Sequence, residues 1–411
     1  MKKFILVIYI ILVLAPLLAF FLYHSNSGHD FYWYLRISYT ICGIGLLIES
    51  FAFRKKLNIP NFLIPFILYA IYQLLWSMIN GSIEKRGVFY FINNEHLQTI
   101  FMLIISYNVI ITKKMKDYLT YMFLITVILT LFVSIVQFFN PMFFSFSANE
   151  NIWDIYQIRR GSIFTIIAPL DLGLSFLPII ALLIAEYLAE NKRGSIFLML
   201  IGGLVSVLSN TRWVMGGYIL ILTMVVFHYR SRFFGRARKL IVTMLSIACI
   251  LFFITYLGYD LGQFWNERLL SEGSLTQTTR FFAITNFLRF FPEKPWFGTG
   301  VHLTEEIYAA SHAFGSSQIH VGYLSHLVSF GIIGSIFLFG FWLWLAITLW
   351  KNAKKTDHWG SFYAFLIFLW GEATWVHFSL MHYGLIFAFI FDNYYISNSR
   401  ILEKSARTNT L

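Results

Sequence analysis

Long apolar stretches, each bounded by polar or basic residues, run along most of the 411-residue chain. Each is close to the roughly 20 residues that an α-helix needs to cross a bilayer. The first stretch resembles a signal peptide, but no small-x-small cleavage site follows it, so we interpret it as a retained helix. The pattern predicts about twelve spans, at residues 4–23, 32–53, 62–79, 98–112, 118–139, 163–188, 195–209, 211–228, 240–258, 319–350, 360–376 and 377–397. The sequence therefore predicts an all-α, polytopic membrane protein that forms a single membrane-embedded domain over residues 1–411.

Composition supports this class and excludes a soluble one. Hydrophobic residues make up 58% of the chain and charged residues 12%, with a mean hydropathy of +0.68. A soluble domain of this size carries roughly twice that share of charge. The two cysteines lie in apolar runs and give no disulfide or zinc pattern. No HExxH spacing, Walker loop or Rossmann glycine pattern occurs, so we predict neither a metal nor a cofactor.

The formal charge of +11 could suggest nucleic-acid binding, but in a membrane protein an excess of Lys and Arg mainly sets orientation. When the N-terminus is placed in the cytoplasm, every inner segment between predicted spans is basic. This assignment also leaves the C-terminus in the cytoplasm. It places the longest connection, residues 259–318, on the outer face of the membrane, and it gives nucleic acid no role.

The basic residues that fall outside are unusual in type, because eight of the ten are arginine. They are Arg36, Lys85, Arg86, Arg159, Arg160, Arg212, Arg268, Arg280, Arg289 and Lys294. Arginine grips phosphate through two parallel N–H bonds, which lysine does poorly. The set favours an anionic, phosphorylated and lipid-linked ligand. The alternative is that single arginines reach lipid headgroups or pair with outer acids such as Asp154, Glu267 or Glu272.

Two short outer segments present arginine next to predicted spans. Arg159 and Arg160 precede Gly161 at the start of a span that contains Asp171, and an intramembrane acid of this kind needs a polar cavity or a cation. Arg212 lies in a tight turn, Ser209-Asn210-Thr211-Arg212-Trp213, between two other spans. The turn is either a plain interfacial anchor or a fixed phosphate contact.

The long outer loop contains a predicted amphipathic helix over residues 278–291. Apolar residues at Phe281, Ile284, Phe287 and Leu288 recur at helical spacing, so the helix could lie on the membrane surface. Arg280 falls at its start. Pro292 and Pro295 end it, and Trp296-Phe297-Gly298-Thr299-Gly300 predicts a turn. Because a loop of this length is rarely without a role, we expect it to bind ligand or take part in catalysis.

His320 stands at the end of this loop, at the outer start of the next span. A neutral imidazole there could take a proton from a hydroxyl group near neutral pH, although a lone histidine at a helix end is more often a polar cap. His302, His312 and His326 are rivals for the same role. Tyr323, like several aromatic residues of the loop, could stack on sugar or simply pack in the core.

These residues resemble the O-antigen polymerase and O-antigen ligase family of bacterial envelopes. The matching strings are Arg160-Gly161-Ser162-Ile163-Phe164, Thr211-Arg212, Arg280, Pro295-Trp296-Phe297-Gly298-Thr299-Gly300, and His320-Val321-Gly322-Tyr323-Leu324 leading to Gly331-Ile332-Ile333-Gly334. Their order and predicted sidedness fit the family over about residues 155–350. One position departs from it, since the family usually has Asn where this chain has Val321; His326 or Gln318 could take over an orienting role.

The resemblance implies a metal-independent, inverting glycosyltransferase of the large membrane-embedded (GT-C-like) type in the bacterial inner membrane. Its donor would be an oligosaccharide on undecaprenyl diphosphate, and its partners a saccharide acceptor, the lipid bilayer and a chain-length regulator. Arg212 and Arg280 would contact the diphosphate, supported by Arg160, Arg289 and Arg159. His320 would act as general base on the outer, periplasmic or extracellular, face, and Tyr323 would contact substrate.

Three functions stay open at this point. A polymerase passes the growing chain to a new lipid-linked repeat unit, and we favour it because such enzymes serve many surface polysaccharides. A ligase passes the glycan to lipid A core or another final acceptor. A lipid-linked oligosaccharide flippase is the third, but a transporter favours charges along a path through many spans, whereas here the charges gather at the outer face.

Overall fold

The computed structural model describes residues 57–81, 95–108, 111–139, 170–190, 192, 194–209, 212–229, 279–300, 321–373 and 383–408, with a few positions between 41 and 52. All secondary structure in these residues is helical. In chain order the helices are η1 (Asn61–Leu63), α3 (Ile64–Ile79), α6 (Glu95–Asn108), α7 (Lys113–Phe139), α9 (Leu170–Ala189), α10 (Ser195–Leu208), α11 (Arg212–His228), α14 (Thr279–Phe290), η5 (Phe291–Glu293), α16 (Gly322–Thr356), α17 (Gly360–Glu372) and α18 (Tyr383–Thr408).

The predicted all-α class is therefore confirmed for the described residues, and each predicted span that falls on them coincides with a helix. By length and composition, three stretches could cross a membrane: Asn61–Ile79, Lys113–Val136 and Gly322–Thr356. Four further apolar helices are shorter. The predicted spans 4–23 and 240–258 lie outside the described residues, as does most of 32–53. The total of twelve spans and the orientation in the membrane stay predictions.

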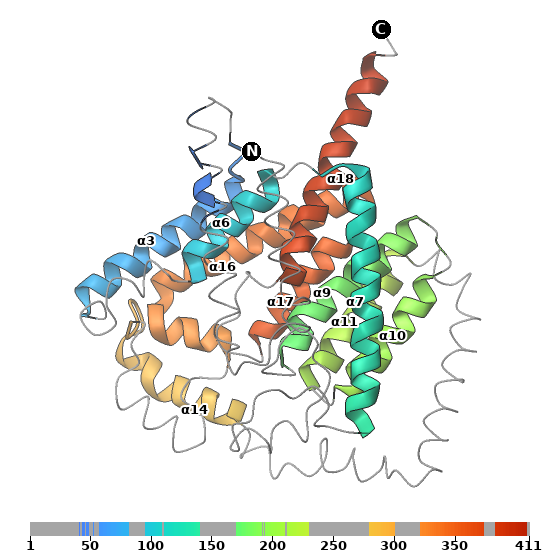
Figure 1. The fold of residues 1–411 in the computed structure, drawn as a ribbon. Coiled ribbons are helices and arrows are strands. Elements are labelled where there is room, and N and C mark those ends of the chain that lie inside the picture. The colour runs from blue at the N-terminus through green and yellow to red at the C-terminus, as the bar shows by residue number, and fades with distance from the viewer. Residues whose placement is uncertain are drawn as a thin grey trace.

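Helix α9 forms the centre of the bundle, with α7, α10, α11, α17 and α18 packed around it (Figure 1). Every residue from 176 to 186 is buried, so this stretch has no face left for lipid. Its neighbours approach closely through small residues: a Cβ placed on Gly360 of α17 would lie 2.9 Å from Cα of Leu182. Close approach at glycine is the usual way in which membrane helices gain packing contacts.

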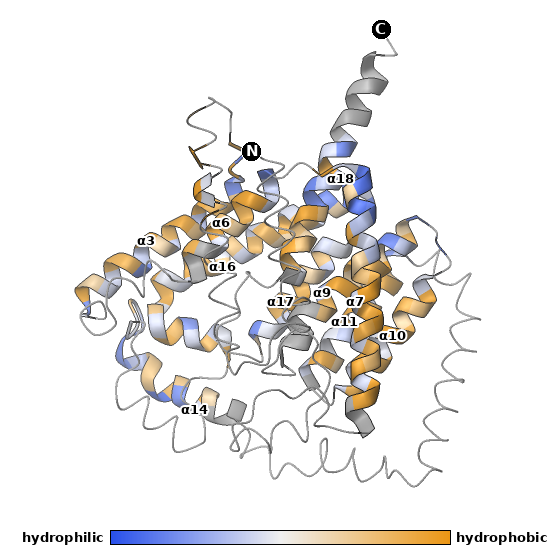
Figure 2. Ribbon diagram, viewed as in Figure 1, coloured by the Kyte–Doolittle hydropathy of each residue, from blue (hydrophilic) through white to orange (hydrophobic). Residues whose placement is uncertain are grey.

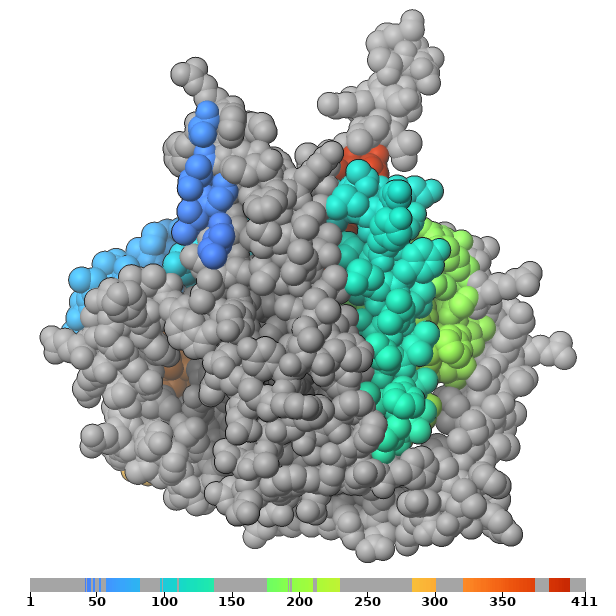
Figure 3. Space-filling view, viewed as in Figure 1, coloured from blue at the N-terminus to red at the C-terminus, as the bar shows by residue number. Residues whose placement is uncertain are grey.

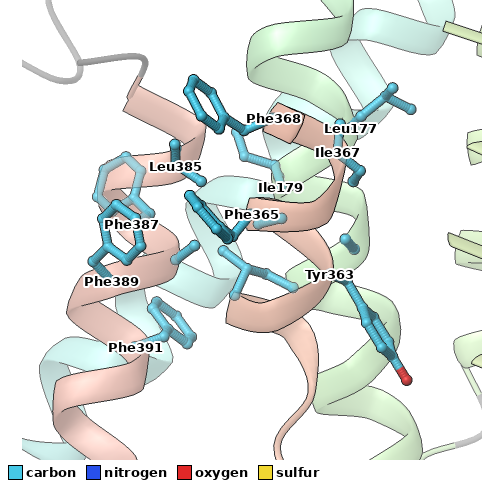
Figure 4. Close-up of a cluster of buried hydrophobic side chains, with 14 of the residues drawn as sticks. Leu177, Ile179, Tyr363, Phe365, Ile367, Phe368, Leu385, Phe387, Phe389 and Phe391 are labelled. Carbon is cyan, nitrogen blue, oxygen red and sulfur yellow. The ribbon is translucent and has the colours of Figure 1, made fainter. Parts of the chain in front are cut away.

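Aromatic side chains fill the space where α17 and α18 meet α9 (Figure 4). Phe365 and Phe368 of α17 lie among Phe387 and Phe389 of α18, and Phe365 and Phe389 are fully buried. Burying a side chain of this size stabilises a packed core by about 1.5 to 3 kcal/mol. This core fixes α17 up to its last turn, which is the turn that contributes to the candidate site.

The outer surface of the bundle is apolar where lipid would cover it. On α7, Tyr121, Ile125 and Phe132 are each more than half exposed and recur on one face of the helix. Helix α7 itself runs along the side of the molecule shown in Figure 3. Near the end of α3, Leu75, Met78 and Ile79 are also more than half exposed. A soluble protein rarely leaves so many large apolar residues exposed together, so these faces support the membrane assignment.

The segments expected in the cytoplasm meet at one end of the bundle. Asn58, before α3, is hydrogen-bonded to Asn108, the last residue of α6. Lys116 near the start of α7 contacts Glu186 near the end of α9, and the Tyr229 hydroxyl at the end of α11 donates to the carbonyl of Asp357. Polar residues gather at this end of α7 and α18 in Figure 2. Helix α14 lies at the opposite end (Figure 1).

Candidate functional site

Helix α16 is broken at Gly331, whose φ of 64° and ψ of −170° lie outside helical geometry. The turn at residues 295–300 fills the break. The N–H groups of Ile332 and Ile333, which in a continuous helix would bond to the carbonyls of Val328 and Ser329, donate instead to Pro295 and Trp296. The two carbonyls left over accept from Thr299 and Gly300 at 2.8 Å. The two N–H groups and two carbonyls that lose their helical partners at the break therefore bond to the turn instead. Within a membrane, backbone groups need such partners inside the protein.

Glycine is required on both sides of this contact. Gly298 has a φ of 74°, and a Cβ there would lie 2.5 Å from the backbone nitrogens of Phe330 and Gly331. The hydroxyl of Tyr72 from α3 donates to the carbonyls of Phe297 and Phe330, so it joins the turn, the broken helix and α3. The sequence predicted the turn, and this prediction is confirmed. The predicted span over residues 319–350 coincides with α16, but the sequence did not predict the break at Gly331, because the partner that breaks the helix comes from the loop.

The predicted amphipathic helix of the loop is confirmed as α14, followed by η5 at the predicted proline. Ala283 and Phe290 are buried and pack against Val328 of α16. Ile284 and Leu288 are 48% and 65% exposed. One side of the helix therefore faces the protein. Of the predicted apolar stripe, Phe287 packs against this contact, whereas Ile284 and Leu288 are left for the membrane surface.

The two arginines of α14 are not placed side by side. Arg280 and Arg289 are nine residues apart, so the two positions lie about 180° apart around the helix axis and roughly 13 Å along it. The exposed Arg289 has its guanidinium carbon 4.9 Å from the ring centre of Phe290. Contact of both arginines with one small diphosphate group is therefore not expected from their positions on this helix.

Arg212 is the first residue of α11, which places its backbone at a helix N-terminus, where anions are favoured. The next residue is held firmly: the indole Nε1–H of Trp370 on α17 donates to the carbonyl of Trp213 at 3.0 Å. A Cβ on Gly216 would lie 2.6 Å from the same indole ring. The start of α11 is therefore fixed against the last turn of α17.

Tyr323, in the first turn of α16, reaches the same turn of α17. Its hydroxyl donates to the carbonyl of Leu369 at 2.6 Å, and its ring packs edge-on against Trp342. Tyr323 thus helps to fix α16 against α17, and its hydroxyl is already engaged. These contacts match the core-packing alternative for this residue more closely than a direct role in sugar binding.

A further set of polar groups converges one turn deeper. His326 of α16 has Nδ1 3.3 Å from the hydroxyl of Tyr69 on α3 and Nε2 3.8 Å from Oε2 of Glu372 on α17. Gln73 donates from Nε2 to the Tyr69 hydroxyl at 3.1 Å. Glu372 and Tyr69 are fully buried, and His326 is 9% exposed. We call Tyr69, His326 and Glu372 the outer polar line.

The sequence indicated His326 as a rival to His320 and as a candidate for the orienting role of the family's Asn, and it did not single out Glu372 or Tyr69. Glu372 carried a usable signal, because an acid inside a predicted span is costly unless it has a polar neighbour. The same signal marked Asp171, whose side chain lies outside the described residues. Tyr69 gave no signal of its own, since only the packing of α3 on α16 brings its hydroxyl to the histidine.

Other predicted site residues lie outside the described part of the chain. His320, Arg159 and Arg160 are among them, as are the rivals His302 and His312. For Arg212 and Arg280 the backbone is described and the side chains are not. Within the described residues, no group of three or more His, Cys, Asp or Glu could hold a metal ion.

Part of the chain matches a known protein family. The O-antigen ligase family matches residues 196–339, about a third of the chain. This segment contains all but the first residue of α10, together with α11, α14, the turn at 295–300 and the break in α16. No curated protein matches the sequence. Residues 196–339 thus match the O-antigen ligase family, which confirms the resemblance to the O-antigen polymerase and ligase family that the motifs predict.

Proposed function

We propose that this protein is a polysaccharide polymerase that transfers a glycan from undecaprenyl diphosphate to a sugar hydroxyl of the acceptor. The acceptor is a second lipid-linked repeat unit, and the product is an O-antigen or capsule-type chain. The enzyme lies in the bacterial inner membrane with its site on the periplasmic or extracellular face. A chain-length regulator is its expected protein partner.

The observation that carries the proposal is the convergence of the family-matched segment on one end of the bundle. The start of α11, which bears Arg212, is bonded to the last turn of α17. The start of α16 is bonded to the same turn, and α14, which bears Arg280, packs on the start of α16. The starts of α11, α14 and α16 are far apart in the sequence but lie at the same end of the bundle. Arg212 and Arg280 lie at the first two of these starts, and His320 comes shortly before the third.

The chemistry follows from the donor. The acceptor oxygen attacks C1 of the donor sugar on the face opposite the phosphate, the C1–O bond to diphosphate breaks, and the anomeric centre inverts. The diphosphate leaves with the electron pair, and Arg212 and Arg280 stabilise the negative charge that develops on it. His320 takes the proton of the acceptor hydroxyl. No metal ion is needed in this scheme, because two guanidinium groups supply the positive charge.

Supporting roles are assigned to the remaining residues. Arg159 and Arg160 add positive charge on the donor side. Arg289 contributes to the attraction of the anionic donor and not to direct contact, because it faces away from the Arg280 position on α14. Tyr323 keeps the start of α16 in place through its bond to Leu369.

A ligase is the second candidate, because the matching family is described as O-antigen ligase. Donor, leaving group and chemistry are shared, and only the acceptor differs. Purified protein incubated with lipid-linked repeat units alone separates the two. We expect a ladder of longer lipid-linked products. If no product forms until a lipid A core acceptor is added, the protein is a ligase.

Substitutions test the assignment within the same assay. Arg280→Ala should lower the rate about 10²- to 10³-fold, since it removes a charge-stabilising donor from the transition state. His320→Ala should lower it by a similar factor. Arg289→Ala, on the same helix as Arg280, is the matched control and should lose less than about tenfold. Equal losses at positions 280 and 289 would contradict the different roles of the two arginines, and loss of activity on adding EDTA would contradict the metal-free scheme.

A further inference from the structure

Helix α16 leaves one side exposed along residues 332–356, the longer piece that follows its break. Ile336, Leu343, Ile347 and Trp350 are 62%, 63%, 40% and 37% exposed. They follow one another at steps of seven, four and three residues, which places them on the same side of the helix. Large apolar side chains exposed together in this way are suited to contact with lipid acyl chains.

This apolar side ends in two exposed lysines, Lys351 and Lys354. The ammonium nitrogen of Lys354 lies 3.9 Å from the ring centre of Trp350, one turn earlier. At this distance the face of the indole ring attracts the cation and holds it beside the apolar side of the helix. Tryptophan is enriched where the hydrocarbon of a membrane meets the headgroups. The pair therefore marks the level at which this side of α16 would meet lipid headgroups.

Neither lysine forms an ion pair within the part of the chain that the structure describes. Lys116 and Lys192, at the same end of the bundle, differ in this respect, because each contacts a glutamate. Asp357 follows Lys354 by three residues, but it lies past the last turn of α16 with a left-handed backbone. The positive charge of Lys351 and Lys354 is therefore not neutralised by a contacting carboxylate, and it can attract an anion.

The length of this side matches one leaflet of a membrane. Gly340 lies on the same side, eleven residues before Lys351, which is roughly 16 Å along the helix. The hydrocarbon of one leaflet is about 15 Å thick, half of the roughly 30 Å of a whole bilayer. Nothing lies within 4 Å of a Cβ placed on Gly340, so the helix surface is open there. An acyl chain whose headgroup is held at Lys351 would reach this opening.

We propose that this side of α16 binds an anionic phospholipid of the inner leaflet. The headgroup phosphate is held by the ammonium groups of Lys351 and Lys354, and an acyl chain lies along Ile347 and Leu343 toward Gly340. Lysine binds phosphate as a point charge, so the net charge of the headgroup decides the affinity. The choice of leaflet follows from the expected orientation, and the lipid contact itself is independent of the glycan transfer proposed above.

A second copy of this chain is a poorer occupant of the same side. Two copies in one membrane have the same orientation, so a symmetric contact through α16 would bring Lys351 and Lys354 of both copies together at one depth. Like charges that face each other across an interface weaken it. An anionic headgroup places opposite charge there instead, and its acyl chain covers the apolar residues. The charge pattern therefore favours a lipid.

The test measures lipid binding to the purified full-length protein in a neutral detergent by native mass spectrometry. Phosphatidylglycerol, which carries a net negative charge, is compared with phosphatidylcholine of the same acyl chains. The wild type should bind phosphatidylglycerol more tightly. Lys351→Gln/Lys354→Gln should weaken this binding roughly 25-fold, because each lysine near an anionic headgroup contributes about fivefold. Binding of phosphatidylcholine should stay unchanged.

Lys113→Gln/Lys114→Gln is the matched control, because it removes the same charge from two exposed lysines at the same end of the bundle. There Asp117 lies one turn away on α7 and already reduces the local charge. The control should change phosphatidylglycerol binding less than about threefold. Equal losses in the two double variants would indicate diffuse attraction to the basic end and overturn the site, as would equal binding of the two lipids by the wild type.

Two further variants test the acyl chain and the rival occupant. Gly340→Leu fills the opening on the helix surface, so it should weaken the binding of both lipids alike; unchanged binding would overturn the path of the chain along α16. Ile347→Cys places a thiol in the middle of the exposed side. In vesicles it should not crosslink one copy to another, because lipid covers it. Efficient crosslinking would place a second copy on this side and overturn the lipid assignment.

Discussion

The two ends of the helix bundle bury polar side chains in different ways. At the inner end, Lys116 and Glu186 lie in direct contact, at 4% and 2% exposure, and Lys116 also reaches Glu190 at 3.1 Å. The Tyr395 hydroxyl donates to Glu186, and His358 stacks on the Tyr395 ring with centroids 3.3 Å apart. We call Lys116, Glu186, Glu190, His358 and Tyr395 the inner hub. Its charges are close together, with the one ammonium group of Lys116 between two carboxyl groups.

The outer end is fixed mainly by backbone. Four hydrogen bonds between the turn at 295–300 and α16, together with the glycine contact, hold the loop in place without any charge. The ionisable groups there are more widely spaced, with 3.8 Å between His326 and Glu372.

This difference matches the roles proposed for the two ends. An end with no proposed chemistry can use its charges for mutual neutralisation, which ties α7, α9 and α18 together. An end that binds a diphosphate needs charge that can respond to the substrate, and must obtain its rigidity from other contacts. Four substitutions test this contrast, in order of decreasing expected effect on stability.

The largest effect is expected for Lys116→Met in the inner hub. The substitution removes the cation and leaves Glu186 buried, which typically costs about 3 to 5 kcal/mol. Unfolding of the purified protein in detergent should show this loss. Lys192→Met is the control: Lys192 is 48% exposed and pairs with Glu190 at the surface, so it should cost less than about 1 kcal/mol. Similar losses for the two variants would mean that the hub does not stabilise the inner end.

The next largest effect is expected for Gly331→Ala at the outer end. A Cβ there would collide with the backbone of Trp296 and Phe297, and a φ of 64° is itself unfavourable for alanine. We expect a loss of about 2 to 3 kcal/mol in the same unfolding assay. Gly340→Ala lies on the same helix, with nothing within 4 Å of the added Cβ, and should leave stability unchanged or raise it by about 0.5 to 1 kcal/mol. Equal behaviour at the two positions would show that the turn does not fix the outer end.

A smaller effect is expected for Glu372→Gln in the outer polar line. The carboxyl group is fully buried and its ion pair spans 3.8 Å, so its charge contributes little net stability. The change should stay within about 1 kcal/mol in either direction. Glu186→Gln in the inner hub removes a short buried pair and should cost clearly more. If the two substitutions cost the same, the two ends do not differ in how they use buried charge.

The helices could be predicted from the sequence because apolar runs of membrane length are a strong local signal. The amphipathic helix from Thr279 and the turn ended by Gly300 were also predicted, since proline and glycine punctuate the loop. The break at Gly331 could not be predicted, because it depends on a turn more than 30 residues away in the chain. The same limit applies to the outer polar line, whose members lie on three helices.

The smallest effect is expected for Glu190→Gln, at the exposed edge of the inner hub. Burial acts to raise the pKa of Glu190, but hydrogen bonds from Lys192 and Lys116 outweigh it and lower the pKa to about 2. A lowered pKa means that the carboxylate stabilises the fold fully above its usual value near 4.5, and that this contribution fades as the pH falls from there toward 2. Because the group is 35% exposed, the difference between wild type and Glu190→Gln should be under about 1 kcal/mol, constant between about pH 6 and 8, and reduced by salt. A loss as large as that of Lys116→Met would place Glu190, and not Glu186, at the centre of the hub.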